Sequence, residues 1–364
     1  MKHRISVATF AAATVALAHA TLASDKVVNV YNWSDYIAED TIAKFEEATG
    51  IKVNYDVFDE NSVLEAKLLA GRSGYDVVVP STSFLSRQIR AGVFQKLDKS
   101  LIPNLVHMDP LIVARTGEAD PDNAYSVNYM WGTTGFGYNV EQISARMADA
   151  PVNSWAMIFD PAIVSRFADC GVAMLDSPDD VVGIALNYLG FSPNSEDAAE
   201  LAKAEALLMS IRPHIRYFHA SQYISDLANG DICLAVGYSG DVLQAADRAS
   251  EAGKTFEIVY AIPAEGTQLW FDNMAIPADA PNPANAHAFI NFILEPQISA
   301  DITNFVSYAS GNAAALEFVD EEIRSNPAVF PPDEIKQKLY TLKEHSPAFQ
   351  RLLTRTWTRV KTGR

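Results

Sequence analysis

The stretch VVNVYNWSDYIAEDTIAKFEEATGIKVNYDV, from Val27 to Val57, changes its hydrophobic pattern twice. Residues 27–31 form an almost continuous apolar run, which is typical of a buried strand. Asp40 is a candidate N-cap for a helix that ends before Gly50, because a glycine often follows the last helical residue. Residues 51–57 then alternate between apolar and polar side chains, which predicts a second strand.

The same order of elements continues along the chain. Ser62–Glu65 reads SVLE, a capping box that predicts the start of a helix ending at Gly71. Tyr75–Val79 is a short apolar strand that Pro80 stops. Strands that alternate with helices favour a parallel sheet with both faces covered, so the sequence predicts an α/β fold.

Polar and aromatic residues follow two of these strands. Trp33, Ser34, Asp35 and Tyr36 come after the first strand, and the segment 81–83 comes after the third. Ligands of such sheets bind outside the carboxyl ends of the strands. We therefore expect both segments to reach the same edge of the sheet.

The N-terminus carries the pattern of an export signal. Lys2 and Arg4 precede an apolar run over residues 5–18, and small residues before Ala20 and Ala23 offer two cleavage sites. We predict that residues 1–23 are a secretory signal peptide, because the apolar run is shorter than the roughly 20 residues that span a membrane. We expect no membrane span in the rest of the chain.

The charge balance excludes some classes of partner. Without residues 1–23 the chain has 26 basic and 45 acidic residues, which gives a net charge of −19. A nucleic-acid-binding protein needs a basic face, so we expect no nucleic-acid partner. Such acidity suits a small cationic ligand, although it can also serve solubility alone.

The chain has two cysteines, Cys170 and Cys233. An even number of cysteines in an exported protein suggests a disulfide bond. We expect this bond to join two parts of one domain.

Two segments look like crossings between domains. Tyr129–Asn139 reads YMWGTTGFGYN, and its three glycines allow backbones to pack closely. A second α/β region follows, and Thr267–Pro277 looks like the return into the first domain.

Enzyme and metal signatures are absent from the sequence. Gly237–Asp241 resembles a nucleophile elbow, but Asp241 stands where the last glycine is required. His214 and His219 are five positions apart and cannot share a helix face as zinc ligands. We therefore expect no catalytic residues, no metal and no cofactor.

Acidic residues recur beside aromatic residues. The clusters are Trp33–Tyr36, Tyr238–Asp241 and Trp270–Asp272, with Tyr308 as a further isolated aromatic. An ammonium group is attracted by a carboxylate and by an aromatic face, the latter by roughly 0.5–2 kcal/mol. Each cluster alone also fits turn chemistry and core packing. Only their convergence in space would make a site for a diamine.

With these features in view, the chain resembles the periplasmic polyamine-binding proteins of ABC importers, and most of all the putrescine-binding branch. The resemblance is carried by YNWSDYIAEDTIAKFEEATGIKV, YDVVVPSTSFLSRQI, YMWGTTGFGYNV, IRYFHASQYISDLANGDICLAVGYSGDV and FPPDEIKQKLYTLKEHSP. It implies a type II-like periplasmic-binding-protein fold, in which two α/β lobes joined by a hinge close on the ligand. We expect lobe 1 to comprise residues 24–134 and 272–318, and lobe 2 to comprise residues 135–271 and 319–364.

The resemblance also implies a set of binding residues. Trp33 and Tyr36 would be walls of a ligand slot, with Ser34 and Asp35 as polar contacts near one ammonium group. The other expected contributors are the side chains of Ser81, Asp180, Tyr238, Asp241, Trp270, Asp272 and Tyr308. The two cysteines match the disulfide pair of the putrescine branch.

Three positions depart from the family pattern. Tyr238 stands where the family usually has tryptophan, Trp270 stands where the putrescine branch usually has phenylalanine, and Asp180 replaces a glutamate. Tryptophan at position 270 resembles the spermidine branch. The expected function is capture of putrescine or a close polyamine in the periplasm and delivery to an ABC permease and its ATPase. A spermidine or broad polyamine receptor, or a receptor for signalling, is the alternative, and we expect a monomer.

Overall fold

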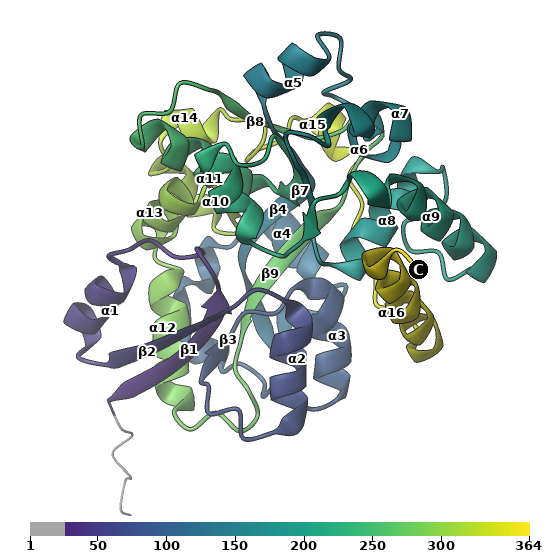
Figure 1. The fold of residues 1–364 in the computed structure, drawn as a ribbon. Helices are drawn as coiled ribbons and strands as arrows, with labels where there is room; N and C mark the ends of the chain where they lie inside the picture. Colours follow the sequence, from purple (N-terminus) through teal and green to yellow (C-terminus); the bar gives the residue numbers. More distant parts are fainter. Residues whose placement is uncertain (1–25) are drawn as a thin grey trace, which may run out of the picture.

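The computed structural model describes residues 26–364, so the predicted signal peptide lies outside the described residues. The described chain forms two lobes, each with its own hydrophobic core (Figure 1). We call the half built on the N-terminal strands lobe 1 and the half that contains the disulfide lobe 2. The exact boundaries between them, predicted at residues 134/135, 271/272 and 318/319, stay a prediction.

Lobe 1 begins with the predicted parallel sheet. Strand β1 lies between β2 and β3 and is parallel to both. The elements are β1 (Val27–Trp33), α1 (Thr41–Thr49), β2 (Lys52–Phe58), α2 (Asn61–Ala70), β3 (Val77–Val78) and α3 (Thr82–Arg90). The β-α-β-α-β prediction is therefore confirmed, although β3 is shorter than the segment 75–79 that we expected.

The helix ends of lobe 1 differ in detail from the predictions. Gly50 has a φ of 69° and ends α1 as expected. Asp40 stands at the N-cap but makes no cap hydrogen bond there, and instead forms an ion pair with Lys44 at 2.9 Å. The predicted capping box at Ser62 is wrong, because α2 already begins at Asn61. The Ser62 hydroxyl donates to Glu60, which occupies the N-cap position.

One long strand, β4, runs through both lobes. Strand β4 (Ser126–Asn139) pairs antiparallel with β9 (Leu269–Ala275) and β10 (Ala309–Ser310) in its first half, and with β7 (Leu234–Tyr238) and β8 (Ile258–Ala261) in its second half. Both predicted crossing segments thus lie side by side in the middle of the molecule (Figure 1).

The glycines of β4 are required by close packing. A Cβ atom on Gly135 would lie 2.3 Å from the carbonyl oxygen of Ala261. On Gly137 it would lie 2.5 Å from Val242 in α11 (Ser239–Glu251). The crossing strand therefore accepts neighbours on both sides only because these positions lack a side chain.

Lobe 2 continues the sheet in the order β4-β7-β5-β6. Strand β5 (Val172–Met174) is parallel to β7 and to β6 (Tyr217–Phe218). The helices around its core are α5 (Val140–Arg146), α6 (Ala156–Phe159), α7 (Pro161–Val164), α8 (Pro178–Tyr188), α9 (Ala198–Ile211), α10 (Gln222–Asn229), α11 and α16 (Pro347–Thr362).

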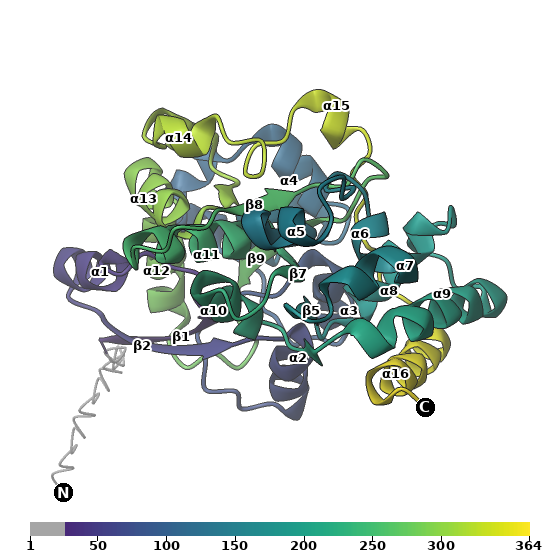
Figure 2. The same cartoon turned by 45° about the horizontal axis from the view of Figure 1, so that its top comes forward.

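Further helices complete the molecule, and Figure 2 shows α14 and α15 at the edge opposite to β1 and β2. These elements are α4 (Pro110–Thr116), α12 (Pro283–Ile293), α13 (Pro296–Val306), α14 (Glu321–Arg324) and α15 (Asp333–Lys336). No helix between residues 26 and 364 has the length and apolar character to cross a bilayer.

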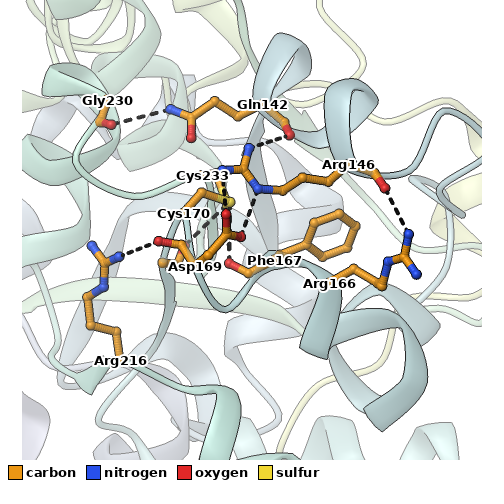
Figure 3. Close-up of polar contacts among 10 residues, drawn as sticks. Gln142, Arg146, Arg166, Phe167, Asp169, Cys170, Arg216, Gly230 and Cys233 are labelled. Carbon is orange, nitrogen blue, oxygen red and sulfur yellow. Dashed lines mark hydrogen bonds and ion pairs between the residues drawn. A yellow bond between two sulfur atoms is a disulfide. The ribbon is translucent and has the colours of Figure 1, made fainter.

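The predicted disulfide bond between Cys170 and Cys233 is present (Figure 3). It joins the segment before β5 to the segment before β7, and both cysteines belong to the core of lobe 2. Beside it, the Arg146 guanidinium donates to both carboxylate oxygens of Asp169 at 2.8 and 2.9 Å. The bond therefore stabilises one lobe and does not link the two lobes.

We predict that replacing both cysteines with serine lowers the free energy of unfolding of lobe 2. The bond closes a loop with a sequence separation of 63, for which the chain-entropy relation gives about 4 kcal/mol. Urea unfolding followed by circular dichroism measures this loss, and the reduced wild-type protein serves as the control. Equal unfolding midpoints for the oxidised protein and the double variant would contradict the prediction.

Candidate functional site

A cavity lies between the lobes at the carboxyl ends of β1, β2 and β3. The predicted residues that line it are Trp33, Ser34, Tyr36, Ser81, Asp180, Tyr238, Asp241, Trp270, Asp272 and Tyr308. The segments that follow the first and third strands thus meet at one edge, as the sheet topology predicted. The three acid–aromatic clusters converge on the same space.

Asp35 is the predicted residue that does not line the cavity. Its φ of 52° turns the chain just after β1. The carboxylate then lies 2.7 Å from the Arg248 guanidinium on α11 of lobe 2, and both side chains keep about two fifths of their surface exposed. Asp35 therefore contacts the opposite lobe instead of the cavity.

Three of the four predicted carboxylates line the cavity, and each of these accepts a hydrogen bond from at least one tyrosine hydroxyl. Tyr238 donates to Asp180 at 2.9 Å. Tyr36 donates to Asp272 at 2.9 Å. Tyr308 donates to one oxygen of Asp241 at 2.6 Å, and Tyr223 on α10 donates to the other oxygen at 2.6 Å. These bonds hold the carboxylates in place without neutralising their charge.

Local structure positions each carboxylate. Asp180 and Asp241 lie in the first turns of α8 and α11, where the unpaired N–H groups favour negative charge. Asp272 lies within β9 and forms an isolated antiparallel bridge with Ser81, whose hydroxyl donates to its carboxylate at 2.5 Å. All three side chains therefore come from different secondary-structure elements with fixed directions.

Aromatic rings form the walls between the carboxylates. The Tyr308 ring lies 5.2 Å from the rings of Tyr36 and Trp270, in both cases edge to face. Tyr238 packs on the other side of Trp270 with a centroid distance of 5.7 Å. The Trp33 indole donates to the Val79 carbonyl at 2.9 Å, which fixes its orientation. Flat, rigid walls of this kind suit an unbranched alkyl chain.

Burial changes the protonation of the carboxylates. Burial raises the pKa of Asp272 to about 7, and the charges of Asp180 and Asp241 add to the rise, while hydrogen bonds from Ser81 and Tyr36 oppose it. Burial likewise raises the pKa of Asp241 to about 6. The pKa of Asp180 is also raised, mainly by burial. Burial therefore disfavours the charged form of all three carboxylates, and no lining side chain supplies a positive charge to offset this.

The sequence analysis missed several lining residues. Asp59 and Asn61 follow β2, the second parallel strand, so the rule applied to the first and third strands would have found them. The Asn61 amide contacts Ser81, and the Ser34 hydroxyl donates to Asp59 at 2.5 Å. Ser83 also lines the cavity and belongs to the segment 81–83 that we expected at this edge. The other lining residues not predicted are Phe58, Phe84, Ser177, Asp179, Ala220, Ser221, Ile224 and Gln268.

The cavity has the chemistry of a site for an organic cation. Among residues 26–364, no lysine, arginine or histidine lines it. No group of three acidic, histidine or cysteine side chains in the described part of the chain is placed to hold a metal ion. A ligand with two separated ammonium groups would pair the carboxylates and bring its alkyl chain against the aromatic walls.

We predict that this carboxylate cluster makes the ligand-free protein less stable as the pH rises from 5 to 8. The folded-state pKa of Asp272 is about 7, above the ordinary value of 3.8, so the folded state binds more protons than the unfolded state in this range. The free energy of unfolding of Asp272→Asn, minus that of wild type, should therefore increase by roughly 2–3 kcal/mol between pH 5 and pH 8. Chemical denaturation at each pH measures the difference. Asp149→Asn, at an exposed position, is the control, and a parallel pH dependence of the wild-type protein and Asp272→Asn would contradict the prediction.

Comparison with known proteins yields a consistent group. A family model described as "Bacterial extracellular solute-binding protein" matches residues 40–331. The chain is 51% identical over 346 residues to the putrescine-binding periplasmic protein SpuD of Pseudomonas aeruginosa, which covers 95% of this chain and 94% of that protein. It is 50% identical over 357 residues to the putrescine-binding periplasmic protein PotF of Escherichia coli, with 97% and 96% covered.

A solved structure agrees with these relatives. The putative spermidine/putrescine ABC transporter protein from Listeria monocytogenes superimposes with a TM-score of 0.83 at 32% identity, and the match covers 93% of this chain and 100% of that one. The predicted two-lobe α/β fold is thus confirmed. These relatives are solute-binding transport proteins and not enzymes.

Proposed function

Because the chain belongs to the bacterial extracellular solute-binding protein family, we propose that it captures a polyamine dication, putrescine first of all, between its two lobes. The ligand then passes to the permease of an ABC transporter, which a cytoplasmic ATPase drives. The observation that carries the proposal is the convergence of Asp180, Asp241 and Asp272 in one aromatic cavity without a cationic side chain.

The chemistry of the cavity favours a diamine over other small solutes. Each ammonium group has three N–H donors and no acceptor, which matches carboxylates that already accept bonds from tyrosines. A charge-assisted hydrogen bond of this kind contributes roughly 1.5–3 kcal/mol. A sugar or an amino acid would leave buried carboxylates unpaired, and unpaired buried charge is unfavourable.

Contacts between the lobes support closure around the ligand. Tyr308 of lobe 1 donates to Asp241 of lobe 2, and Asp35 pairs with Arg248 across the same side of the cavity. A ligand that bonds to Asp272 and Asp241 would add to these contacts. Closure also removes water, which strengthens each charge interaction in the cavity. The location would be the periplasm, as for the relatives, and the working form would be a monomer.

We predict that the stripped protein binds putrescine in a calorimetric titration, and that Asp241→Asn weakens this binding by roughly 10- to 100-fold. The reason is the loss of one charge-assisted hydrogen bond in a cavity that excludes water. The protein must first be unfolded, dialysed and refolded, because a copurified ligand would hide binding. Maltose and glutamate are the negative ligands.

Asp247→Asn provides the matched control, since Asp247 lies on the same helix α11 but outside the cavity. This variant should bind putrescine like wild type. Equal affinity of Asp241→Asn and wild type would show that the carboxylates do not hold the ligand.

A spermidine or broad polyamine receptor is the second candidate. Trp270 lines the cavity between Tyr238 and Tyr308, and Asp180 is shorter than the glutamate expected at its position. A larger ring offers a better face to a cation, and a shorter acid leaves more room. A receptor for signalling would bind the same ligand but dock on a sensor domain, which pull-down with the purified permease would distinguish.

We predict that Trp270→Phe lowers the affinity for spermidine about 5-fold more than the affinity for putrescine. The reason is the weaker cation–π attraction of the smaller ring, with a difference of about 1 kcal/mol. Parallel titrations with putrescine, spermidine, cadaverine and agmatine measure the change. Trp131→Phe is the control, because Trp131 lies on β4 outside the cavity. An unchanged ratio of the two affinities would remove Trp270 from the determinants of ligand choice.

A further inference from the structure

The segment Tyr340–Ser346, which we call the strap, lies between α15 and α16. The Asn194 side chain of lobe 2 makes two hydrogen bonds to the strap backbone. Its Nδ2 donates to the Thr341 carbonyl at 3.0 Å, and its Oδ1 accepts from the Lys343 backbone N–H at 2.7 Å. Glu196 accepts hydrogen bonds from the backbone amide and the hydroxyl of Ser346 at 2.6 and 2.7 Å. The strap is therefore fastened to lobe 2.

The strap also packs behind the part of the cavity wall that contains Asp180. Tyr340 forms a parallel bridge with Gln268, which lines the cavity, and the charge of Asp180 raises the pKa of the Tyr340 phenol in addition to its burial. Leu342 packs on α8, the helix that carries Asp180, so closely that a Cβ on Gly183 would lie 3.0 Å from its side chain. Movement of the strap is thus tied to the position of α8.

One strap residue reaches lobe 1. The Glu344 carboxylate accepts a hydrogen bond from the Ser86 hydroxyl at 2.9 Å and forms an ion pair with Arg90. Ser86 and Arg90 lie on α3, the helix whose N-cap is Ser81 and which carries Phe84 into the cavity wall. These contacts join a segment fastened to lobe 2 with a helix of lobe 1.

The charges around Glu344 favour this contact. Arg87 is also near Glu344, but its guanidinium is held by both oxygens of Glu65 at 2.6 and 2.9 Å. Arg90 is therefore the partner of Glu344. The Glu344 side chain is 21% exposed, against 42% for Asp35 in the ion pair with Arg248. Helices α11 and α3, which carry the two arginines, lie on opposite sides of β4 and β9 (Figure 1).

We propose that Glu344 is a closure latch: its contacts with Arg90 and Ser86 on α3 stabilise the closed arrangement of the lobes and slow release of the bound polyamine. Glu344 acts as a positioning residue, because it does not line the cavity that holds the ligand. The inference rests on the proposed function for its ligand. Together with the Asp35–Arg248 pair, the latch would hold the two lobes together on both sides of the cavity.

The test is stopped-flow kinetics of putrescine release from the refolded, ligand-free protein loaded with putrescine. Glu344→Gln should raise the dissociation rate constant roughly 5-fold and change the association rate constant less than 2-fold, because the contact forms after the lobes meet. The difference from wild type should shrink in 0.5 M salt, because ions screen a partly exposed pair. The double variant Arg90→Glu with Glu344→Arg should restore slow release.

Glu205→Gln is the matched control. Glu205 is also 21% exposed and pairs with an arginine, Arg359, but both residues lie in lobe 2. This variant should leave both rate constants unchanged even if it lowers stability. Equal release rates for Glu344→Gln and Glu205→Gln would overturn the latch.

Small-angle scattering of the ligand-free protein separates the latch from the proposed ligand. Glu344→Gln should give a larger radius of gyration than wild type and Glu205→Gln, because more molecules are open. If wild type failed to bind putrescine, the proposed function would fail while this comparison still decided the latch. Identical scattering of all three proteins would overturn the latch, whatever the ligand.

Discussion

The rest of this structure depends on negative charge that is buried without a cation. Asp180, Asp241 and Asp272 meet between the lobes, and the raised pKa values of all three follow mainly from burial. The tyrosine hydroxyls that bond to them stay protonated, since the pKa values of Tyr36 and Tyr308 are raised well above their ordinary range. They fix direction but supply no positive charge. Unpaired buried charge is unfavourable, so a cation that entered this cavity would stabilise the charged form of these carboxylates.

The framework around this charge lets two lobes share one site. Strand β4 pairs with β9 in its first half and with β7 and β8 of lobe 2 in its second half, and its glycines let neighbouring elements approach closely. The disulfide lies wholly within lobe 2, so it stiffens one lobe without restricting motion between lobes. Contacts across the cavity are instead hydrogen bonds and ion pairs, such as Tyr308 with Asp241 and Glu344 with Arg90. These polar contacts can break and re-form in water at a small free-energy difference.

Two independent observations support a polyamine as the class of ligand: the similarity to putrescine-binding proteins, and the carboxylates and aromatic rings that line the cavity. Identity near 50% extends over almost the whole chain. Three positions that the resemblance marks as departures from the family pattern lie together: the Tyr238 ring packs on Trp270, and the Tyr238 hydroxyl donates to Asp180. The differences therefore concern one part of the cavity wall, and the strap that packs against α8 lies behind the same place.

The sequence by itself determined the alternating strands and helices at the start of lobe 1 and the edge of the sheet at which the cavity lies. The hydrophobic pattern predicted β1 and β2, and the glycines Gly50 and Gly71 marked the ends of α1 and α2, because these features depend on neighbours within a few residues. The topology of parallel strands then predicted that the segments after β1 and β3 reach the same edge. Only the tertiary structure decided which side chains line the cavity. The left-handed backbone at Asp35 turns that carboxylate toward Arg248, the Tyr223 hydroxyl bonds to Asp241 on the next helix, and Glu344 meets Arg90 of the other lobe. Side-chain direction across a cleft depends on how two separately folded lobes pack, and no local pattern encodes it.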